Sequence, residues 1–229
     1  PVYLTAAELR EKLAVPIPNE HTERYAARAR RLGVYIQAGT FLGADPPWPR
    51  AVFNTTCLVG PEGILAKYRK VNPWIPWEVH ASPHDLEGYE EEAFPVADTP
   101  IGRIGAAICY DWLFPEAIRQ LTANGAEVLV RVSAYMDPWG ATAPMDWWTV
   151  INRARAIENL AYVLAPAQGG YHLSGRETHG DSMIVDPWGV VLDRLPRGSG
   201  VVIAGVNPNY QKELRESLPA LGHRTIRTL

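Results

Sequence analysis

Residues 103–116 read RIGAAICYDWLFPE, and this stretch changes from apolar residues to polar and aromatic ones. It predicts a strand followed by a helix, an order that recurs along the chain. A run of small and apolar residues ends on Cys109, and polar and aromatic residues follow up to Pro115. The run predicts a short buried strand, and proline is typical of the first turn of a helix. A structural cysteine usually packs inside such a run as a small hydrophobe. A cysteine at the exit of the strand is instead placed to react.

Strand and helix patterns alternate on both sides of this stretch. Asn19 can cap a helix that Gly33 ends, and the Gly-Pro-Glu-Gly sequence at 60–63 is a hairpin signal. We expect helices over 20–32, 114–125, 143–160 and 208–218, and strands over 34–42, 51–59, 64–70, 103–109, 126–133, 161–167, 181–186, 190–195 and 200–206. This alternation predicts a sheet-based α/β or α+β domain with helices covering the sheets.

Composition narrows the classes of function. The 229 residues are 47% hydrophobic and 21% charged, with a net charge of −3 and both signs interspersed. This charge gives no basic field for nucleic acid or an acidic membrane. No apolar run reaches the length of a membrane span, and no signal-peptide pattern opens the chain. The two cysteines suggest neither a disulfide framework nor a zinc site, so we expect a reducing cytoplasm. No linker-like shift in composition marks a domain boundary, so we expect a single domain, residues 1–229.

Cys109 is the first candidate for chemistry. A free thiol is only a few per cent thiolate at neutral pH, so a nucleophilic cysteine needs a base or a cation nearby. Backbone N–H groups that follow it can point at a developing oxyanion. The alternative interpretation is a buried core cysteine. That interpretation suits Cys57, which lies in the middle of an apolar run.

Lys70 is the second candidate, at the end of the cationic stretch KYRK. Such a stretch at a strand end is usually a solvated rim. However, VNPWIPWE follows it, and a lysine facing this rigid apolar wall would present a fixed ammonium to an anion. Glu78 closes the segment and could pair with the lysine or orient a substrate amine. Otherwise it is a surface acid.

Other patterns carry less chemistry. His80 and His84 have helical spacing, but Pro83 argues against a helix between them, so we expect no metal site. No dinucleotide or phosphate-loop fingerprint is present. Trp74 and Trp139 lie in predicted loops, where they could wall a binding pocket.

Five segments in order resemble the nitrilase, or carbon–nitrogen hydrolase, superfamily: 26–41, 53–74, 101–130, 152–165 and 181–189. The likeness covers nearly the whole chain. The Cys-Tyr-Asp sequence after the strand is similar to the amidase and carbamoylase branches, whereas nitrilases proper tend to have Cys-Trp-Glu. NPWIPWE and LVRVSAYMDPWG resemble the aliphatic amidase and formamidase branch in particular.

This resemblance implies an α-β-β-α four-layer sandwich with a Glu-Lys-Cys triad and no cofactor. Its nucleophile falls on Cys109, its lysine on Lys70 and the second glutamate of the amidases on Glu78. The N–H of Tyr110 would be an oxyanion donor, and Trp74 would form a wall of the pocket. The rest of the implied substrate pocket consists of Ser133, Ala134 and Tyr135. The partners implied are a small-molecule amide and further copies of the chain, in a homodimer or larger homo-oligomer.

One member of the triad has no counterpart in the sequence. The general-base glutamate of the family precedes the first matched segment, and Glu8, Glu11 and Glu20 do not follow a predicted strand. The first strand, first helix and second strand of the fold also lack counterparts, so we expect the chain to be incomplete at its N-terminus.

Taken with the resemblance, these residues predict an amidohydrolase that cleaves a small carboxamide to an acid and ammonia through a cysteine thioester. Three alternatives stay open. Two are enzymes of the same superfamily, a nitrilase and an N-carbamoyl amidohydrolase. The third is a catalytically dead binding or assembly subunit.

Overall fold

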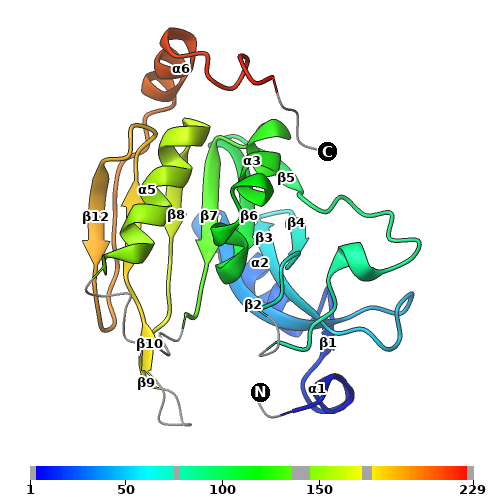
Figure 1. Cartoon of the computed structure of the whole chain (residues 1–229). Helices are drawn as coiled ribbons and strands as arrows, with labels where there is room; N and C mark the ends of the chain where they lie inside the picture. The colour runs from blue at the N-terminus through cyan, green and yellow to red at the C-terminus, as the bar shows by residue number, and fades with distance from the viewer. Residues whose placement is uncertain (1–3, 75–77, 136–144, 172–176, 226–229) are drawn as a thin grey trace. The chain divides into compact units, whose positions relative to one another are not determined.

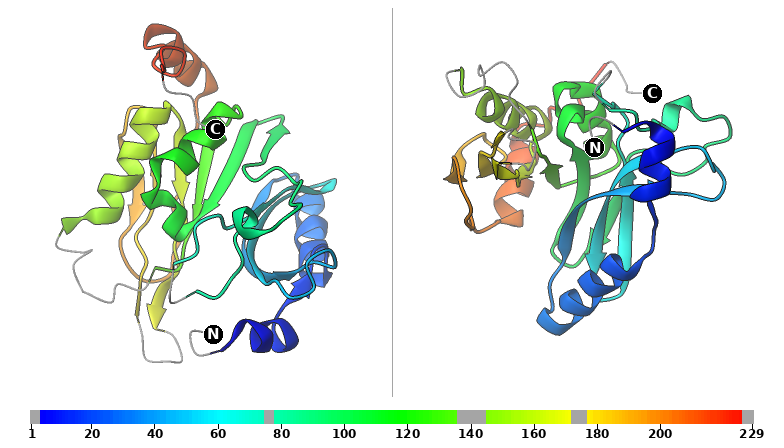
Figure 2. Two further views of the ribbon diagram at one scale, coloured as in Figure 1. Left: turned by 45° about the vertical axis from the view of Figure 1, so that its right-hand side comes forward. Right: turned by 90° about the horizontal axis from the view of Figure 1, so that it is seen from below.

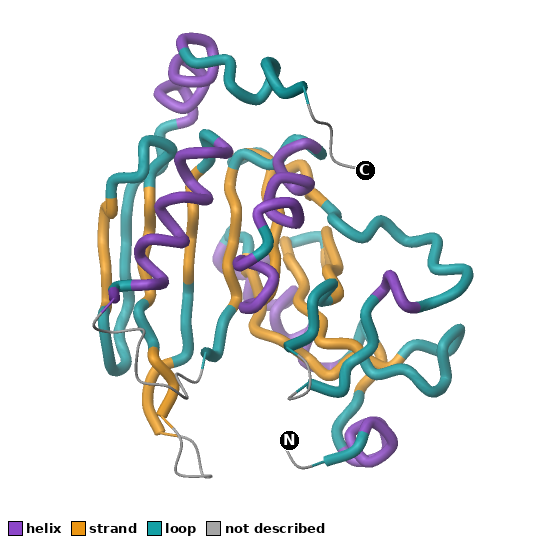
Figure 3. Tube along the Cα trace, viewed as in Figure 1, coloured by secondary structure: helices purple, strands orange, loops and turns teal. Residues whose placement is uncertain are grey.

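The computed structural model describes residues 4–74, 78–135, 145–171 and 177–225 of the chain (Figures 1 and 3). Its chain forms two compact units, Pro1–Ala97 and Asp98–Leu229, which are described separately below. Trp139, a predicted pocket residue, lies outside the described residues. The expectation of one domain over residues 1–229 stays a prediction.

The first unit is built on a four-stranded sheet in the order β1-β2-β3-β4. The short β1 runs parallel to β2, and the other neighbours are antiparallel. The strands are β1 (Val15–Pro16), β2 (Ile36–Ala44), β3 (Phe53–Gly60) and β4 (Gly63–Arg69). The helices are α1 (Ala6–Lys12), α2 (Glu20–Leu32) and the 3₁₀ turn η1 (Pro83–Asp85).

Helix α2 forms where its capping residues predict it. The Asn19 side chain accepts from the N–H groups of His21 and Thr22, and the Thr22 hydroxyl accepts from the Asn19 N–H. Gly33 ends the helix with φ 64°, a conformation that glycine adopts without strain. The helix packs on the sheet through Ala26, against Cys57 of β3 (Figure 2). Cys57 is 0% exposed, which confirms its place in the core.

The second unit is built on a six-stranded sheet in the order β12-β11-β8-β7-β6-β5. Strands β6, β7 and β8 are parallel, whereas β8, β11 and β12 are antiparallel. The strands are β5 (Val96–Thr99), β6 (Gly102–Ile108), β7 (Val128–Val132), β8 (Tyr162–Ala165), β11 (Ser182–Val185) and β12 (Val191–Leu195). A separate hairpin joins β9 (Gly169–Tyr171) and β10 (Glu177–His179).

Helices α3 (Pro115–Ala123) and α5 (Trp147–Asn159) lie side by side over one face of this sheet (Figure 1). The 3₁₀ turn η2 (Cys109–Leu113) joins β6 to α3, and α6 (Pro208–Ser217) follows the sheet. Both units therefore combine a sheet with helices. The predicted mixed α/β class is confirmed.

Two predictions of local structure are wrong. The expected strand over 200–206 has no regular structure, and Val201 and Ile203 are 81% and 79% exposed. A run of apolar, β-branched residues forms a strand only where a neighbouring strand pairs with it and its side chains are buried. No strand is predicted over residues 177–179, which form β10. Among the described residues, no helix has the length and apolar character needed to cross a membrane.

Candidate functional site

Cys109 lies at a sharp turn between β6 and η2. The strand ends at Ile108, and Cys109 has φ 47°, in the left-handed region that residues other than glycine rarely adopt. Such a conformation costs on the order of 1–3 kcal/mol and persists only where the surroundings enforce it. The side chain is partly exposed. The turn therefore presents the thiol at the end of a buried strand, as the sequence predicts.

Hydrogen bonds from three directions enforce this turn. The Ile108 N–H donates to Asp111 Oδ2 at 3.0 Å, and Asp111 is 0% exposed. The Trp112 indole N–H reaches back to the carbonyl of Ala107 at 3.4 Å. Arg155 of α5 donates through Nε and Nη2 to the Trp112 carbonyl at 3.0 and 2.9 Å. Strand, turn and helix thus hold the backbone around the cysteine rigidly.

The residues predicted to line the pocket in this unit lie beside the turn. Strands β6 and β7 are parallel and pair Ile108 with Val132, so Cys109 and Ser133 follow at the same edge of the sheet. Ser133 is buried and Ala134 is exposed. The Tyr135 carbonyl accepts from the His179 N–H at 2.8 Å. The Tyr110 ring packs edge-on against Phe114, at 5.2 Å between ring centroids.

The other predicted residues meet in the first unit, directly after β4. Lys70 is 2% exposed, and its Nζ donates to Glu78 Oε2. The same carboxylate oxygen accepts from the Trp74 N–H at 2.6 Å. The Asn54 side-chain amide donates to the other oxygen at 3.4 Å. The interpretation of Lys70 as a solvated rim residue is therefore wrong, because a carboxylate partner allows the ammonium to be buried.

Burial and ion pairing determine the direction in which the pKa values of Glu78 and His80 shift. Burial alone would raise the pKa of Glu78, but the Lys70 ammonium and the Trp74 N–H outweigh it and hold that pKa below its ordinary value. His80 Nδ1 lies 3.8 Å from Glu78 Oε1. Burial, helped by Lys70, lowers the pKa of His80 although Glu78 opposes the shift. Glu78 is thus a carboxylate and His80 a neutral imidazole at neutral pH.

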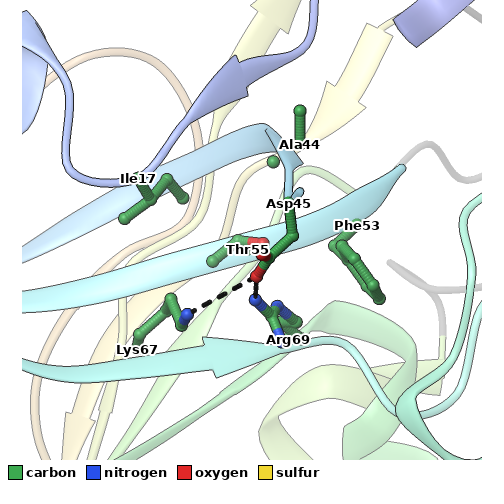
Figure 4. A pocket seen from close by; sticks show the side chains of 8 residues that line it. Ile17, Ala44, Asp45, Phe53, Thr55, Lys67 and Arg69 are labelled. Carbon is green, nitrogen blue, oxygen red and sulfur yellow. Dashed lines mark hydrogen bonds and ion pairs between the residues drawn. The ribbon is translucent and has the colours of Figure 1, made fainter. Parts of the chain in front are cut away.

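A second ion cluster of the first unit is structural. Figure 4 shows Asp45 between Lys67 and Arg69, with Arg69 donating to the Asp45 carboxylate. The Arg69 guanidinium also lies 4.4 Å from the centre of the Phe53 ring. The cavity beside these residues measures about 10 Å³, which is room for no more than a water molecule. It cannot take a substrate.

Sequence reasoning missed two residues near the predicted ones. His80 was considered only as a metal ligand, and within the described residues no cluster of three His, Cys, Asp or Glu side chains could hold a metal. Arg131 lies inside the apolar run AEVLVRVS and is 0% exposed in β7. A charged residue in a buried strand is unusual enough to have been a signal.

Comparison with known proteins gives the family. The carbon-nitrogen hydrolase family model matches residues 2–216. A deaminated glutathione amidase of Synechocystis sp. (strain PCC 6803 / GT-S) is 39% identical over 223 residues, which cover 90% of this chain and 76% of the relative. The human deaminated glutathione amidase is 37% identical, with 93% of this chain and 65% of the relative covered. The chain thus spans about two thirds of the length of its human relative.

Solved structures agree with this assignment. The C. elegans NitFhit protein is 34% identical with a TM-score of 0.72, covering 90% of this chain and 50% of that one. Saccharomyces cerevisiae Nit3, of the nitrilase superfamily, is 24% identical with a TM-score of 0.80, covering 97% of this chain and 79% of that one. The second likeness supports the fold alone. On the match over residues 2–216, the chain belongs to the carbon-nitrogen hydrolase family.

Proposed function

We propose that this protein is an amidase that hydrolyses the C–N bond of a small carboxamide through a thioester on Cys109. The observation that carries the proposal is the turn at Cys109, where a partly exposed thiol sits on a left-handed residue at a strand end. Strain of this kind concentrates at functional sites. The relatives named amidases, which are 33–39% identical over most of this chain, support the choice of reaction.

The reaction starts with transfer of the Cys109 proton to a general base. By the family resemblance, this base is a glutamate upstream of the matched segments. The sulfur then attacks the amide carbonyl carbon, and the carbonyl oxygen becomes an oxyanion. By the same resemblance, the Lys70 ammonium and the Tyr110 N–H are the donors that stabilise this oxyanion. Each such donor typically contributes about 2.7–4 kcal/mol.

The second half of the reaction restores the thiol. The protonated base gives its proton to the departing nitrogen, the C–N bond breaks, and the acyl group remains on sulfur as a thioester. Water, deprotonated by the same base, attacks the thioester and releases the acid. Glu78 holds the Lys70 ammonium in place throughout, since it accepts a hydrogen bond from Lys70 Nζ.

The leaving group distinguishes two kinds of substrate. A primary carboxamide releases ammonia. Glutathione is a tripeptide, so the relatives named for its deaminated form act on a compound with secondary amides, which release an amine. We propose a small carboxamide, for which the family resemblance implies Trp74 and Tyr135 as pocket residues. An assay panel of primary amides and of short peptides with secondary amides would separate the two kinds of substrate. The quantity measured is the release of ammonia or of an amine.

The proposal is tested with two matched cysteine variants. Cys109→Ala removes the nucleophile and is expected to lower amide turnover more than about a thousandfold, as removal of a nucleophile does in hydrolases. Cys57→Ala removes a thiol that is 0% exposed in β3, and turnover should persist. Measured release of ammonia or amine decides the outcome. Retained turnover in folded Cys109→Ala protein would refute the proposal.

A further inference from the structure

Four basic side chains are buried among the described residues: Arg69, Lys70, Arg131 and Arg155. Three of them have hydrogen-bond acceptors. Arg69 donates to Asp45 and Lys70 to Glu78, and Arg155 donates to the Trp112 carbonyl. Arg131 is the exception. It is 0% exposed, and none of its guanidinium nitrogens has a hydrogen-bond partner in the described part of the chain.

An unpaired guanidinium is expensive to bury because it loses its hydration and its five N–H donors stay unused. Native proteins therefore place an anion near such a group, permanently or at one step of a reaction. The Trp148 ring lies over the guanidinium, 4.2 Å from its central carbon to the ring centre, and covers one face. An indole ring attracts the cation but carries no negative charge.

Two groups near Arg131 can carry negative charge. Asp181 already accepts a hydrogen bond from Arg194 Nε at 2.6 Å. The Cys109 thiol, in contrast, has no hydrogen-bond or ion-pair partner among the described residues. Arg131 pairs with Ala107 in the β6–β7 register, two residues before Cys109, so its long side chain starts next to the turn that bears the sulfur.

Arg131 keeps its positive charge at neutral pH although it is buried. Burial lowers the pKa of Arg131 to about 10, and Cys109 and Asp181, in that order, oppose the shift. Arg131 is therefore still a cation at neutral pH. It is fully buried, whereas Cys109 is partly exposed. Substrate can approach the sulfur while the guanidinium acts on it from within the protein.

We propose that Arg131 is a positioning residue that stabilises the thiolate of Cys109. This inference rests on the proposed function, because it takes Cys109 as the nucleophile. The sulfur proton goes to the general base, and Arg131 neither gives nor takes a proton. In the neutral thioester the guanidinium is unpaired again. Release of the thiolate in the deacylation step restores the pair, so the same charge assists both half-reactions.

Several other charged or titratable groups surround the turn and must be considered in any pH profile. Asp111 accepts from the Ile108 N–H, and Arg155 is held by the Trp112 carbonyl. Asp111 is an anion and cannot stabilise a thiolate, and the Arg155 guanidinium already donates to a carbonyl. Among the described residues of this unit, such groups include Tyr110 and Asp111 on η2, Arg131 on β7, Tyr135 after β7, Arg155 and Glu158 on α5, Asp181 before β11 and Arg194 on β12.

The test measures the rate of alkylation by iodoacetamide between pH 5 and 10. A Cys57→Ala background makes Cys109 the only thiol, and burial in any case raises the pKa of Cys57 to about 11. We expect Arg131→Met to move the midpoint of the pH–rate profile upward by about one pH unit or more, as loss of an adjacent opposite charge does. Arg131→Lys keeps a cation and should restore most of the effect.

Two controls keep the outcome decisive. Superimposable pH–rate profiles of the folded Arg131→Met protein and the unaltered Arg131 protein would overturn the inference. If Arg131→Met fails to fold, the unaltered Arg131 protein still tests it: a midpoint at or above that of a free thiol, about 8.5, contradicts the proposal. Alkylation requires no turnover. A protein with the Arg131-dependent shift that hydrolyses no amide would refute the proposed function and leave this inference standing.

Discussion

Lys70 and Arg131 are both buried cations, but their surroundings differ. Lys70 is 2% exposed and donates to Glu78, which also accepts from the Trp74 N–H. Arg131 is 0% exposed, and among the described residues its guanidinium has no acceptor. Glu78 already neutralises the charge of Lys70 in the resting protein. We explain the unpaired Arg131 by the negative charge that forms on the Cys109 sulfur during the reaction. Changes at the two positions should therefore have different consequences.

The largest effect is expected at Lys70. Lys70→Ala leaves the Glu78 carboxylate buried without its partner, so we expect the free energy of unfolding to fall by about 3 kcal/mol. Loss of an oxyanion donor should also lower kcat by roughly a hundred- to a thousandfold. Urea unfolding and turnover measure the two effects. The double variant Lys70→Met with Glu78→Leu should regain stability without activity, and failure to regain it would mean that the pair is not the cause.

Arg131→Met should behave differently in unfolding. Replacing an unpaired buried cation by an apolar side chain of similar length is neutral or stabilising. We expect the free energy of unfolding at pH 6 to stay within about 1 kcal/mol of the unaltered protein or to rise, because loss of the contact with Trp148 offsets part of the gain. Urea unfolding beside Lys70→Ala makes the comparison. An equal loss at both positions would contradict the difference drawn here.

Two substitutions of Cys109 should differ in stability by a smaller amount, in a direction that the turn geometry predicts. Glycine adopts φ 47° without strain, whereas alanine does not. Cys109→Gly should therefore be more stable than Cys109→Ala by about 1 kcal/mol, although both lack the nucleophile. Thermal unfolding of the two variants side by side measures the difference. Equal stability would show that the cysteine is not held in a strained conformation.

The smallest effect concerns pH. The pKa values of Glu78 and His80 are both lowered in the folded protein, so the unfolded chain binds more protons in acid. Their contribution to stability is present at neutral pH. For His80 it is lost as pH falls below about 6.5, and for Glu78 at lower pH still.

His80→Leu should consequently flatten the fall of unfolding free energy between about pH 6.5 and 5, by less than about 1 kcal/mol. The exposed His84 provides a matched control, and His84→Leu should leave the slope unchanged. Urea unfolding at a series of pH values measures the slope. If His84→Leu changed the slope as much as His80→Leu does, burial of His80 would not be the cause of the pH dependence.

Local patterns were enough to predict the turn that bears Cys109. The apolar run before it and Pro115 after it mark the strand end and the helix start, and β6, η2 and α3 follow that order. The pairing of Lys70 with Glu78 is one of three interpretations that the sequence leaves open for Glu78, beside orienting a substrate amine and a surface acid. Only burial, which depends on how the chain folds around the pair, decides between a pair and a solvated rim.

Arg131 could not be assigned from the sequence because its neighbours come from strand pairing. The β6–β7 register places it beside Ala107, which is 24 residues earlier in the chain. The wrong prediction of a strand over 200–206 has the same cause, because strand pairing is not visible in the local sequence. Its run of apolar residues is a local signal, but a strand also needs a pairing partner that the local sequence does not specify.

The most direct measurement of the proposed mechanism is mass spectrometry of the acyl-enzyme. The full protein is quenched in acid during amide turnover and digested with trypsin, which cuts after Arg103 and Arg119 and leaves Cys109 in one peptide. We predict that this peptide gains the mass of the acyl group, and that added hydroxylamine takes up the same group as a hydroxamate. Amide hydrolysis with neither adduct nor hydroxamate would contradict Cys109 as the nucleophile.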